Sequence, residues 1–420
     1  MILNNKKIFK YKELTPLWIA VFIDILGLTI ILPLAPYLGK EFLPMMDDFS
    51  RAFVMGIMLA VNAMVSAFFG PLLGKLSDKY GRRVVLLISQ FGTLLAFVML
   101  AFSSSLEMLI ISRIIDGLFG GNFPVAKAII GDVVPHRDRG IQMANVGTAH
   151  VLSSLFGPAL GGILSEISIN MGLGGLFLPG MFAAGLTIIT MVLTLIILKE
   201  TWPKSKRLEH HGEKKNLKLK IRKNKKALFY LAVWGFHTSV FMISIASISW
   251  FGNYVFRLTR AEVGLLMTFS GILRALVRFT VFKPTVSKLG ENLSIKVGLG
   301  LFVLSFIMIG LAYELVIFII AIMILSFAAS LTRGLLNSKI SRSVSPKEQG
   351  KINGLSSGLE STAQIIGPIV GPTLLGLYAI DVIDLYFIGL FMAVLGIIPF
   401  FMTLNSNNMR GKHEQEEVEK

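Results

Sequence analysis

Residues 74–83 read Gly74-Lys75-Leu76-Ser77-Asp78-Lys79-Tyr80-Gly81-Arg82-Arg83. This charged stretch lies between two apolar runs, at roughly 52–73 and 84–103, and each run is long enough to cross a bilayer as a helix. Because a turn with several cations and a carboxylate cannot lie in hydrocarbon, the stretch predicts a tight loop at a membrane surface. Its cations indicate the cytoplasmic side, and its glycines let a short loop reverse without strain.

The composition of the whole chain also indicates a membrane protein. The 420 residues are 54% hydrophobic and only 16% charged, whereas a soluble globular protein has about 25% charged residues. The net charge of +16 comes largely from cations in segments between apolar runs. We therefore interpret it as a sign of topology and of contact with anionic membrane lipids, and we expect no nucleic-acid binding.

The sequence gives little support for an enzymatic function. The absence of cysteine excludes disulfides, cysteine-ligated zinc, iron–sulfur clusters and thiol catalysis. The segment 70–75 resembles a phosphate-binding loop, but its glycines are one residue too close, and Leu76 stands where Ser or Thr would hold magnesium. We predict that the protein is not an enzyme, that it holds no cofactor or metal, and that a proton or other ion gradient drives it.

The apolar runs number twelve, and the basic segments alternate with them. We predict membrane-spanning helices at roughly 16–39, 52–74, 84–104, 107–131, 141–165, 174–198, 228–252, 262–283, 291–312, 314–336, 350–377 and 382–405. Every second loop is basic, which predicts cytoplasmic N- and C-termini. The polar residues 1–13 precede a run without a nearby cleavage site, so we interpret the first run as an uncleaved helix.

The chain divides into two similar halves. We predict a six-helix half at 1–198, a basic cytoplasmic linker at 199–227, a second half at 228–405 and a cytoplasmic tail at 406–420. The linker is either a solvated segment close to anionic lipid or a regulatory binding site. Three sets of residues recur 210 positions apart, namely Gly140 and Gly350, Gly157-Pro158 and Gly367-Pro368, and Gly161 and Gly371. This repeat favours a transporter with its substrate site near the midplane, between the halves.

Four motifs carry a family resemblance over roughly 15–405. They are Gly74-x-Leu76-x-Asp78-x-x-Gly81-Arg82-Arg83, then Asp24-x-x-Gly27 with Pro33 and Pro36, then Arg113-Ile114-Ile115-Asp116-Gly117 with Gly120-Gly121-Asn122, and Gly157-Pro158-x-x-Gly161-Gly162. With them the chain resembles the major facilitator superfamily, most closely the drug:proton antiporter branch with the tetracycline-efflux and multidrug-efflux proteins. Two features depart from that pattern, Ser153 in place of a usual glycine and the eroded second-half loop 287–291.

The resemblance implies an all-α protein of twelve helices in two six-helix repeats. It implies a secondary transporter in the plasma (inner) membrane that exports small amphipathic compounds in exchange for protons by alternating access. We expect a monomer whose partners are the substrate, protons and lipids. One alternative is a symporter or uniporter of an anionic metabolite that uses Arg113, Arg274 and Arg278. The other is a non-transporting receptor or scaffold, although the sequence shows no long structured extramembrane domain.

The charged loop has two possible roles. Asp78 precedes the third predicted helix, where a carboxylate stabilises a helix N-terminus by roughly 0.3–1 kcal/mol, and Arg82 or Arg83 can pair with Asp132. The resemblance implies a conformational latch made of Gly74, Asp78, Gly81, Arg82, Arg83 and Asp132. The alternative is that the loop only turns the chain and fixes its topology.

The fifth predicted helix carries a helix-bending motif. Pro158 lacks an N–H group, so the segment from Gly157 should bend. Gly161 and Gly162 expose backbone and allow another helix to approach closely. Packing is the simplest role of this motif, and the resemblance adds a specific role in antiport.

Charges inside the predicted spans indicate the functional site, because each costs about 2.5–3.5 kcal/mol at the bilayer centre. Arg113 and Asp116 share a helix face and can pair, either as a static structural pair or as a relay in which Asp116 or Asp24 takes up a proton when Arg113 moves away. We expect Asp24 to face the cavity. The predicted proton-coupling or substrate residues are Asp24, Arg113, Asp116, Arg274 and Glu360.

The remaining intramembrane polar residues have weaker predicted roles. We expect Arg274 to face the cavity or to pair with Glu360. Arg278, one turn further on, either joins it or reaches toward the cytoplasm. We expect Lys127 and Arg333 to lie at the membrane interface. We interpret His150 and His237 as hydrogen-bonded packing residues rather than proton carriers.

Overall fold

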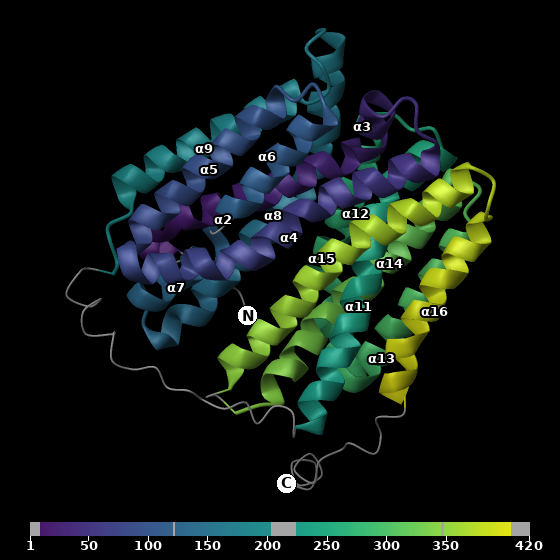
Figure 1. Cartoon of the computed structure of the whole chain (residues 1–420). Coiled ribbons are helices and arrows are strands. Elements are labelled where there is room, and N and C mark those ends of the chain that lie inside the picture. The colour runs from purple at the N-terminus through teal and green to yellow at the C-terminus, as the bar shows by residue number, and fades with distance from the viewer. Residues whose placement is uncertain (1–8, 121, 203–223, 346–347, 405–420) are drawn as a thin grey trace, which may run out of the picture. The chain divides into compact units, whose positions relative to one another are not determined.

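The structure is a computed structural model, and it describes residues 9–120, 122–202, 224–345 and 348–404. Every regular element in these ranges is a helix, which confirms the predicted all-α class (Figure 1). Eleven helical segments among the described residues are long and apolar enough to cross a membrane. Most of the predicted linker and the predicted tail lie outside the described residues.

The chain folds as two compact units. Unit 1 comprises Met1–Asp47, Arg51–Asn216 and Arg257–Phe269, and unit 2 comprises Asp48–Ser50, Leu217–Phe256 and Ser270–Lys420. The helices of unit 1 are α2 (Thr15–Ile31), α3 (Ala35–Phe42), nearly all of α4 (Asp48–Tyr80), α5 (Arg82–Ala101), α6 (Leu106–Phe119), α7 (Asn122–Val133), α8 (His136–Asn170) and α9 (Phe177–Ile197). Those of unit 2 are α11 (Lys225–Trp250), α13 (Phe282–Gly310), α14 (Leu315–Arg342), α15 (Gln349–Ala379) and α16 (Leu385–Leu404). The helix α12 (Arg260–Leu276) contributes residues to both units.

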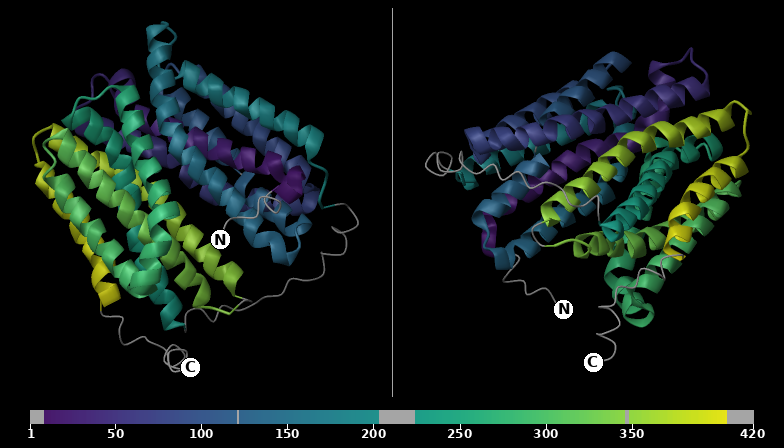
Figure 2. Two further views of the ribbon diagram at one scale, coloured as in Figure 1. Left: turned by 180° about the vertical axis from the view of Figure 1, so that it is seen from behind. Right: turned by 60° about the horizontal axis from the view of Figure 1, so that its bottom comes forward.

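Each unit repeats the same helix packing. In unit 1, α2 packs on α8, and α5 packs on α6 and α9; in unit 2, α11 packs on α15, and α13 packs on α14 and α16 (Figure 2). The glycines that recur in the sequence make equivalent contacts. A Cβ atom at Gly161 of α8 would collide with the carbonyl oxygen of Ile30 on α2, and one at Gly371 of α15 would lie 2.6 Å from the carbonyl oxygen of Ile243 on α11. Glycine is therefore needed at the same place in both units.

The eighth and ninth predicted spans form one helical segment of 51 residues, Arg260–Gly310. The predicted twelve runs therefore correspond to eleven segments among the described residues. The chain still turns within this segment, because Gly290 has φ 73° and ψ 165°. Gly81, between α4 and α5, has a similar conformation with φ 108° and ψ 148°. Only glycine adopts these angles readily, so the eroded second-half loop keeps the backbone turn of the first.

The fourth predicted span is not continuous. It is divided into α6 and α7 at Gly120, which has φ −67° and ψ 41°. The break is packed inside unit 1: a Cβ atom at Gly120 would lie 2.9 Å from Ser66 Oγ, and the Ser89 hydroxyl donates to the carbonyl oxygen of Phe119. Irregular backbone is tolerated at membrane depth where protein surrounds it.

Candidate functional site

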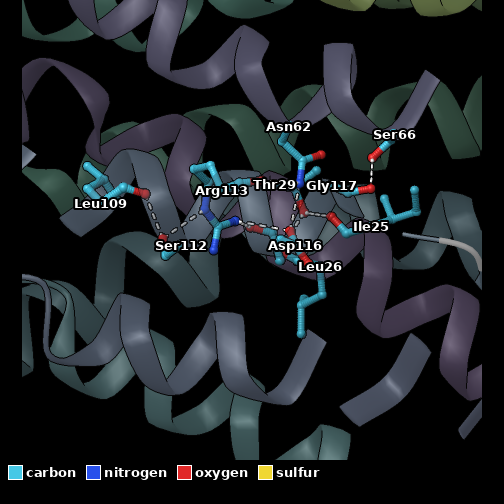
Figure 3. Close-up of polar contacts among 11 residues, drawn as sticks. Ile25, Leu26, Thr29, Asn62, Ser66, Leu109, Ser112, Arg113, Asp116 and Gly117 are labelled. Atoms are coloured by element: carbon cyan, nitrogen blue, oxygen red, sulfur yellow. Dashed lines mark hydrogen bonds and ion pairs between the residues drawn. The ribbon is translucent and has the colours of Figure 1, made fainter. Parts of the chain in front are cut away.

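An ion pair between Arg113 and Asp116 forms the centre of the site in unit 1. Both side chains are buried, and Arg113 Nη1 lies 3.3 Å from Asp116 Oδ2. Figure 3 shows Asn62 of α4 and Arg113 converging on Asp116, with Asn62 Nδ2 donating to the same carboxylate oxygen at 2.8 Å. Arg113 Nη1 also lies 3.4 Å from the carbonyl oxygen of Gly27 on α2. The predicted pair is thus present, and it links three helices.

A second carboxylate lies on α2, one turn before Gly27. Asp24 Oδ1 accepts a hydrogen bond of 2.5 Å from the side-chain amide of Asn122. Asn122 is the first residue of α7, directly after the break in the fourth span. Its side chain is therefore placed by the interruption that the sequence did not predict. The structure brings Asp24, Arg113 and Asp116 into one unit, and it adds Asn62 and Asn122 as their amide partners.

These contacts suit a group that changes its charge. An ionised carboxylate accepts hydrogen bonds, whereas a protonated one also donates. Each of the two aspartates faces an amide, which offers both a donor and an acceptor. Asp116 also has a cationic partner that can contact the backbone of α2 instead. A proton on Asp116 would weaken its attraction for Arg113.

In unit 2 the pair between Arg274 and Glu360, one of the two predictions for Arg274, is not formed. Glu360 of α15 pairs with Arg333 of α14, at 2.5 Å between Oε1 and Nη2, and not with Arg274. Arg333, for which the sequence predicted a place at the membrane interface, also has its guanidinium carbon 5.4 Å and 5.1 Å from the ring centroids of Trp234 and Phe241. The rotation of α14 about its own axis turns this side chain toward α11 and α15.

Arg274 makes only neutral contacts with the described residues. Its Nη1 donates to Ser270 Oγ at 2.7 Å, and its guanidinium carbon lies 5.8 Å from the centroid of the Phe241 ring. Arg278 is exposed.

One of the two intramembrane histidines, His237, packs inside unit 2. His237 is buried among aromatic rings and is 3.1 Å from Thr332 Oγ1, as expected for a packing residue. His150 lies in α8, and its side chain is outside the described part of the chain. Lys127 is exposed, with its Nζ over the Phe123 ring.

The charged stretch 74–83 is mostly helical. The helix α4 continues to Tyr80, so Asp78 lies in its last turn and not in a loop. Arg82 joins two carboxylates: its Nη1 is 2.6 Å from Asp78 Oδ1, and its Nε is 2.9 Å from Asp132 Oδ2 on α7. The predicted pair with Asp132 is therefore formed by Arg82, whereas Arg83 Nη2 donates to the carbonyl oxygen of Leu195.

Glu200 takes the position at the start of α5 that the sequence suggested for Asp78. Its two carboxylate oxygens accept the backbone N–H groups of Arg82 at 2.9 Å and Arg83 at 3.3 Å. The Trp202 ring then lies 5.5 Å from the Arg82 guanidinium. The only feature of the sequence that could have indicated this role of Glu200 is its position among the first polar residues after the sixth apolar run.

The Gly157–Gly162 motif is packed on two sides within unit 1. A Cβ atom at Gly157 would lie 2.8 Å from Thr29 Cβ on α2. Near Pro158, the backbone N–H of Ala159 donates to Thr268 Oγ1 at 3.0 Å, and the same hydroxyl donates to the carbonyl oxygen of Leu155 at 2.9 Å. A side chain of α12 is therefore inserted into the hydrogen-bond ladder of α8, which is a recognised cause of helix bending.

The family model described as "Major Facilitator Superfamily" matches residues 17–280 and 247–420. The chain belongs to the major facilitator superfamily. It is therefore a multi-pass membrane transporter and not an enzyme, as the sequence predicted.

Two relatives place this superfamily member in the drug:proton antiporter branch. The tetracycline resistance protein of class H from Pasteurella multocida is 28% identical over 293 residues, which cover 69% of this chain and 71% of that protein. The multidrug resistance protein MdtG from Proteus mirabilis (strain HI4320) is 27% identical over 279 residues, with 66% of each protein covered. A crystal structure of a D-xylose-proton symporter has a TM-score of 0.75 at 15% identity, covering 94% of this chain and 97% of the symporter, and shares the fold.

Proposed function

We propose that this transporter exports small amphipathic compounds across the plasma membrane in exchange for protons, by alternating access. The observation that carries the proposal is the buried Asp116 carboxylate, shared between Arg113 and Asn62. It occurs in a superfamily member whose relatives are tetracycline and multidrug resistance proteins. An ionisable group inside a membrane span is a natural place for proton coupling.

In this proposal Asp116 is the residue that takes up the proton. Protonation removes the charge that holds Arg113, so the guanidinium turns to the carbonyl oxygen of Gly27, which it already approaches. This exchange of partners links the proton to the packing of α6 against α2. Asp24 then serves as the second polar contact, for the substrate or for the same proton, with Asn122 fixing its orientation.

The energy source is the proton gradient. Moving one elementary charge down a potential of 100 mV supplies about 2.3 kcal/mol. That corresponds to nearly a fiftyfold concentration ratio, since about 1.4 kcal/mol is a factor of ten. The cations of residues 74–83 lie where α4 ends and α5 begins, and such cations indicate the cytoplasmic side. Because every second loop is basic, we propose that both termini also lie in the cytoplasm. We propose that the protein acts as a monomer surrounded by lipid, without nucleic acid or a resident cofactor.

Arg82, Asp78 and Asp132 form the proposed latch. The two ion pairs of Arg82 hold the ends of α4, α5 and α7 together. Rearrangement of these helices during transport requires that at least one pair opens. The strength of the pairs therefore influences which state is populated.

The test uses purified protein in proteoliposomes with a pH-sensitive dye inside and an imposed pH gradient. Tetracycline, the lipophilic cation tetraphenylphosphonium and benzoate are added in turn to the wild type, Asp116→Asn and Asp24→Asn. Glu314→Gln is the matched control, because Glu314 is an exposed acid with no side-chain bond to its helix terminus.

We expect substrate-induced proton flux opposite to substrate flux, at least tenfold lower in Asp116→Asn and unchanged in Glu314→Gln. Benzoate flux in the same direction as protons would instead support symport of an anion. Substrate flux with no proton movement would contradict coupling altogether.

A further inference from the structure

Arg274 brings a positive charge into unit 2 that no described carboxylate balances. Arg333 and Glu360 already neutralise each other. Arg274 meets only a hydroxyl group and the face of an aromatic ring. A charged side chain inside a membrane span is costly and marks a substrate or ion pathway. Because no described carboxylate pairs with Arg274, its charge remains for an anionic ligand to balance.

Several hydroxyl groups fix the position of Arg274. Ser270 Oγ accepts from its guanidinium at 2.7 Å and is in turn 3.2 Å from Ser326 Oγ on α14. Ser330 Oγ, also on α14, donates to the backbone carbonyl oxygen of Arg274 at 2.9 Å. The guanidinium is thus held in place before any ligand arrives, which lowers the entropic cost of binding.

Aromatic rings lie next to the two guanidinium groups. The Phe241 ring is within 5.8 Å of the guanidinium carbons of both Arg274 and Arg333, and Trp234 lies against Arg333 from the same helix, α11. Both rings are buried, Trp234 at 4% and Phe241 at 7% exposed, so they form an apolar backing behind the two cations. Apolar surroundings beside a cation suit a ligand that combines a ring system with a negative group.

The neighbouring face of α15 is polar and accessible. Its residues recur at helical spacing and are Asn353, Ser357, Glu360 and Gln364, each exposed or partly exposed. The Arg333 and Glu360 side chains are 28% and 30% exposed, so a ligand can reach them. A polar stripe on a membrane-spanning helix faces water or protein rather than lipid. This stripe therefore gives a solute in water access to Glu360 and to its partner Arg333.

We propose that Arg274 binds the ionised acidic group of an aromatic substrate. The proposal rests on the export function above and names a class of compound that this transporter carries: amphipathic acids and zwitterions as well as cations. Arg333 serves the same anion more weakly, because Glu360 offsets its charge.

The test is direct binding to the purified full-length protein in detergent at pH 7.5, by titration calorimetry. The probes share one ring system: naphthalene-2-acetic acid, its methyl ester and 2-(2-naphthyl)ethylamine. We expect the acid to bind the wild type at least tenfold more tightly than the ester. Arg274→Gln should remove this preference, Arg274→Lys should keep part of it, and the exposed neighbour Arg278→Gln should leave it unchanged.

A second variant separates ligand binding from a structural role. Glu360→Gln removes the charge that offsets Arg333, so the acid should bind several-fold more tightly than to the wild type. A variant that merely disturbs folding cannot produce tighter binding, and the melting temperature of every variant is measured alongside.

Three results would overturn the proposal. They are equal binding of acid and ester by the wild type, failure of the acid to bind, and an acid preference that survives in Arg274→Gln. Competition by dioctanoyl phosphatidylglycerol without an acid preference among the ring compounds would assign Arg274 to a lipid headgroup instead. The binding assay needs no proton gradient. The absence of an acid preference would therefore not contradict proton exchange, and the absence of proton exchange would not contradict an acid preference.

Discussion

Glu200 accepts the backbone N–H group of Arg82, at 2.9 Å from Oε1, and so completes the first turn of α5. This contact joins two segments more than a hundred residues apart. It holds the segment that follows α9, which ends at Ile197, next to the cluster of Arg82, Asp78 and Asp132. The cluster is therefore held at the backbone of Arg82 as well as at its side chain.

The contact predicts that Glu200→Ala lowers the thermal stability of the protein in detergent. Losing an acceptor at a helix N-terminus costs about 0.5–2 kcal/mol, and losing a negative charge there costs roughly 0.3–1 kcal/mol. Thermal unfolding of the purified variant measures the effect. The control is Glu314→Ala, at the start of α14, where the carboxylate makes no such bond. Equal melting temperatures for the two variants would contradict the role of Glu200.

The two carboxylate partners of Arg82 should differ in importance. The Asp132 and Arg82 side chains are 12% and 8% exposed, whereas that of Asp78 is 59% exposed. Breaking a buried pair costs about 3–5 kcal/mol, while an exposed pair contributes about 0.2–1 kcal/mol. We therefore expect Asp132→Asn to lower the melting temperature clearly more than Asp78→Asn.

Transport rates then decide whether this cluster is a latch. If it is, both Asp132→Asn and Asp78→Asn change the rate of substrate-driven proton flux in proteoliposomes. Wild-type rates in both variants would show that the loop only turns the chain and fixes its topology.

A double variant that removes both charges separates the two interpretations of the pair between Arg113 and Asp116. Arg113→Met leaves a buried carboxylate without its cation and should cost about 3–5 kcal/mol of stability. The double variant Arg113→Met/Asp116→Leu removes both charges and should regain most of that stability. For a static pair, the stable double variant still exchanges protons for substrate. For the proposed relay, it folds but shows no coupled proton flux.

The sequence predicts contacts within one helix better than contacts between helices. Arg113 and Asp116 were expected to pair because their spacing of three fixes their geometry. Pairing with Glu360 was one of two predictions for Arg274, but Glu360 meets Arg333, since the rotation of each helix decides which neighbour a long side chain reaches. The contacts of the Asn62 and Asn122 amides were not predicted for a similar reason. Nothing in a single sequence indicates that they lie beside Asp116 and Asp24.

Helix ends and breaks were also only partly predictable. The charges of residues 74–83 indicated a loop, yet the helix continues to Tyr80 because Gly81 alone can make the reversal. Gly120 was taken as part of a continuous span, although its contacts with α4 show why the chain leaves helical geometry there. A glycine in a sequence does not by itself indicate whether it lies in a turn, at a helix break or where two helices approach closely.

The close approach of α8 to α2 gives a final prediction, on Gly161. A methyl group at this position would collide with the backbone carbonyl of Ile30, and backbone cannot move aside as a flexible side chain can. Gly161→Ala should therefore destabilise the protein by about 1–3 kcal/mol, as overpacking does, although alanine is the better helix former by about 1 kcal/mol.

Gly147→Ala is the matched control on the same helix, because a Cβ atom there has open space, and it should raise the melting temperature slightly. By the repeat between the units, Gly371→Ala should behave like Gly161→Ala, since its Cβ would meet α11 in the same way. A melting temperature of Gly161→Ala equal to or above that of Gly147→Ala would show that α8 and α2 are not packed this closely.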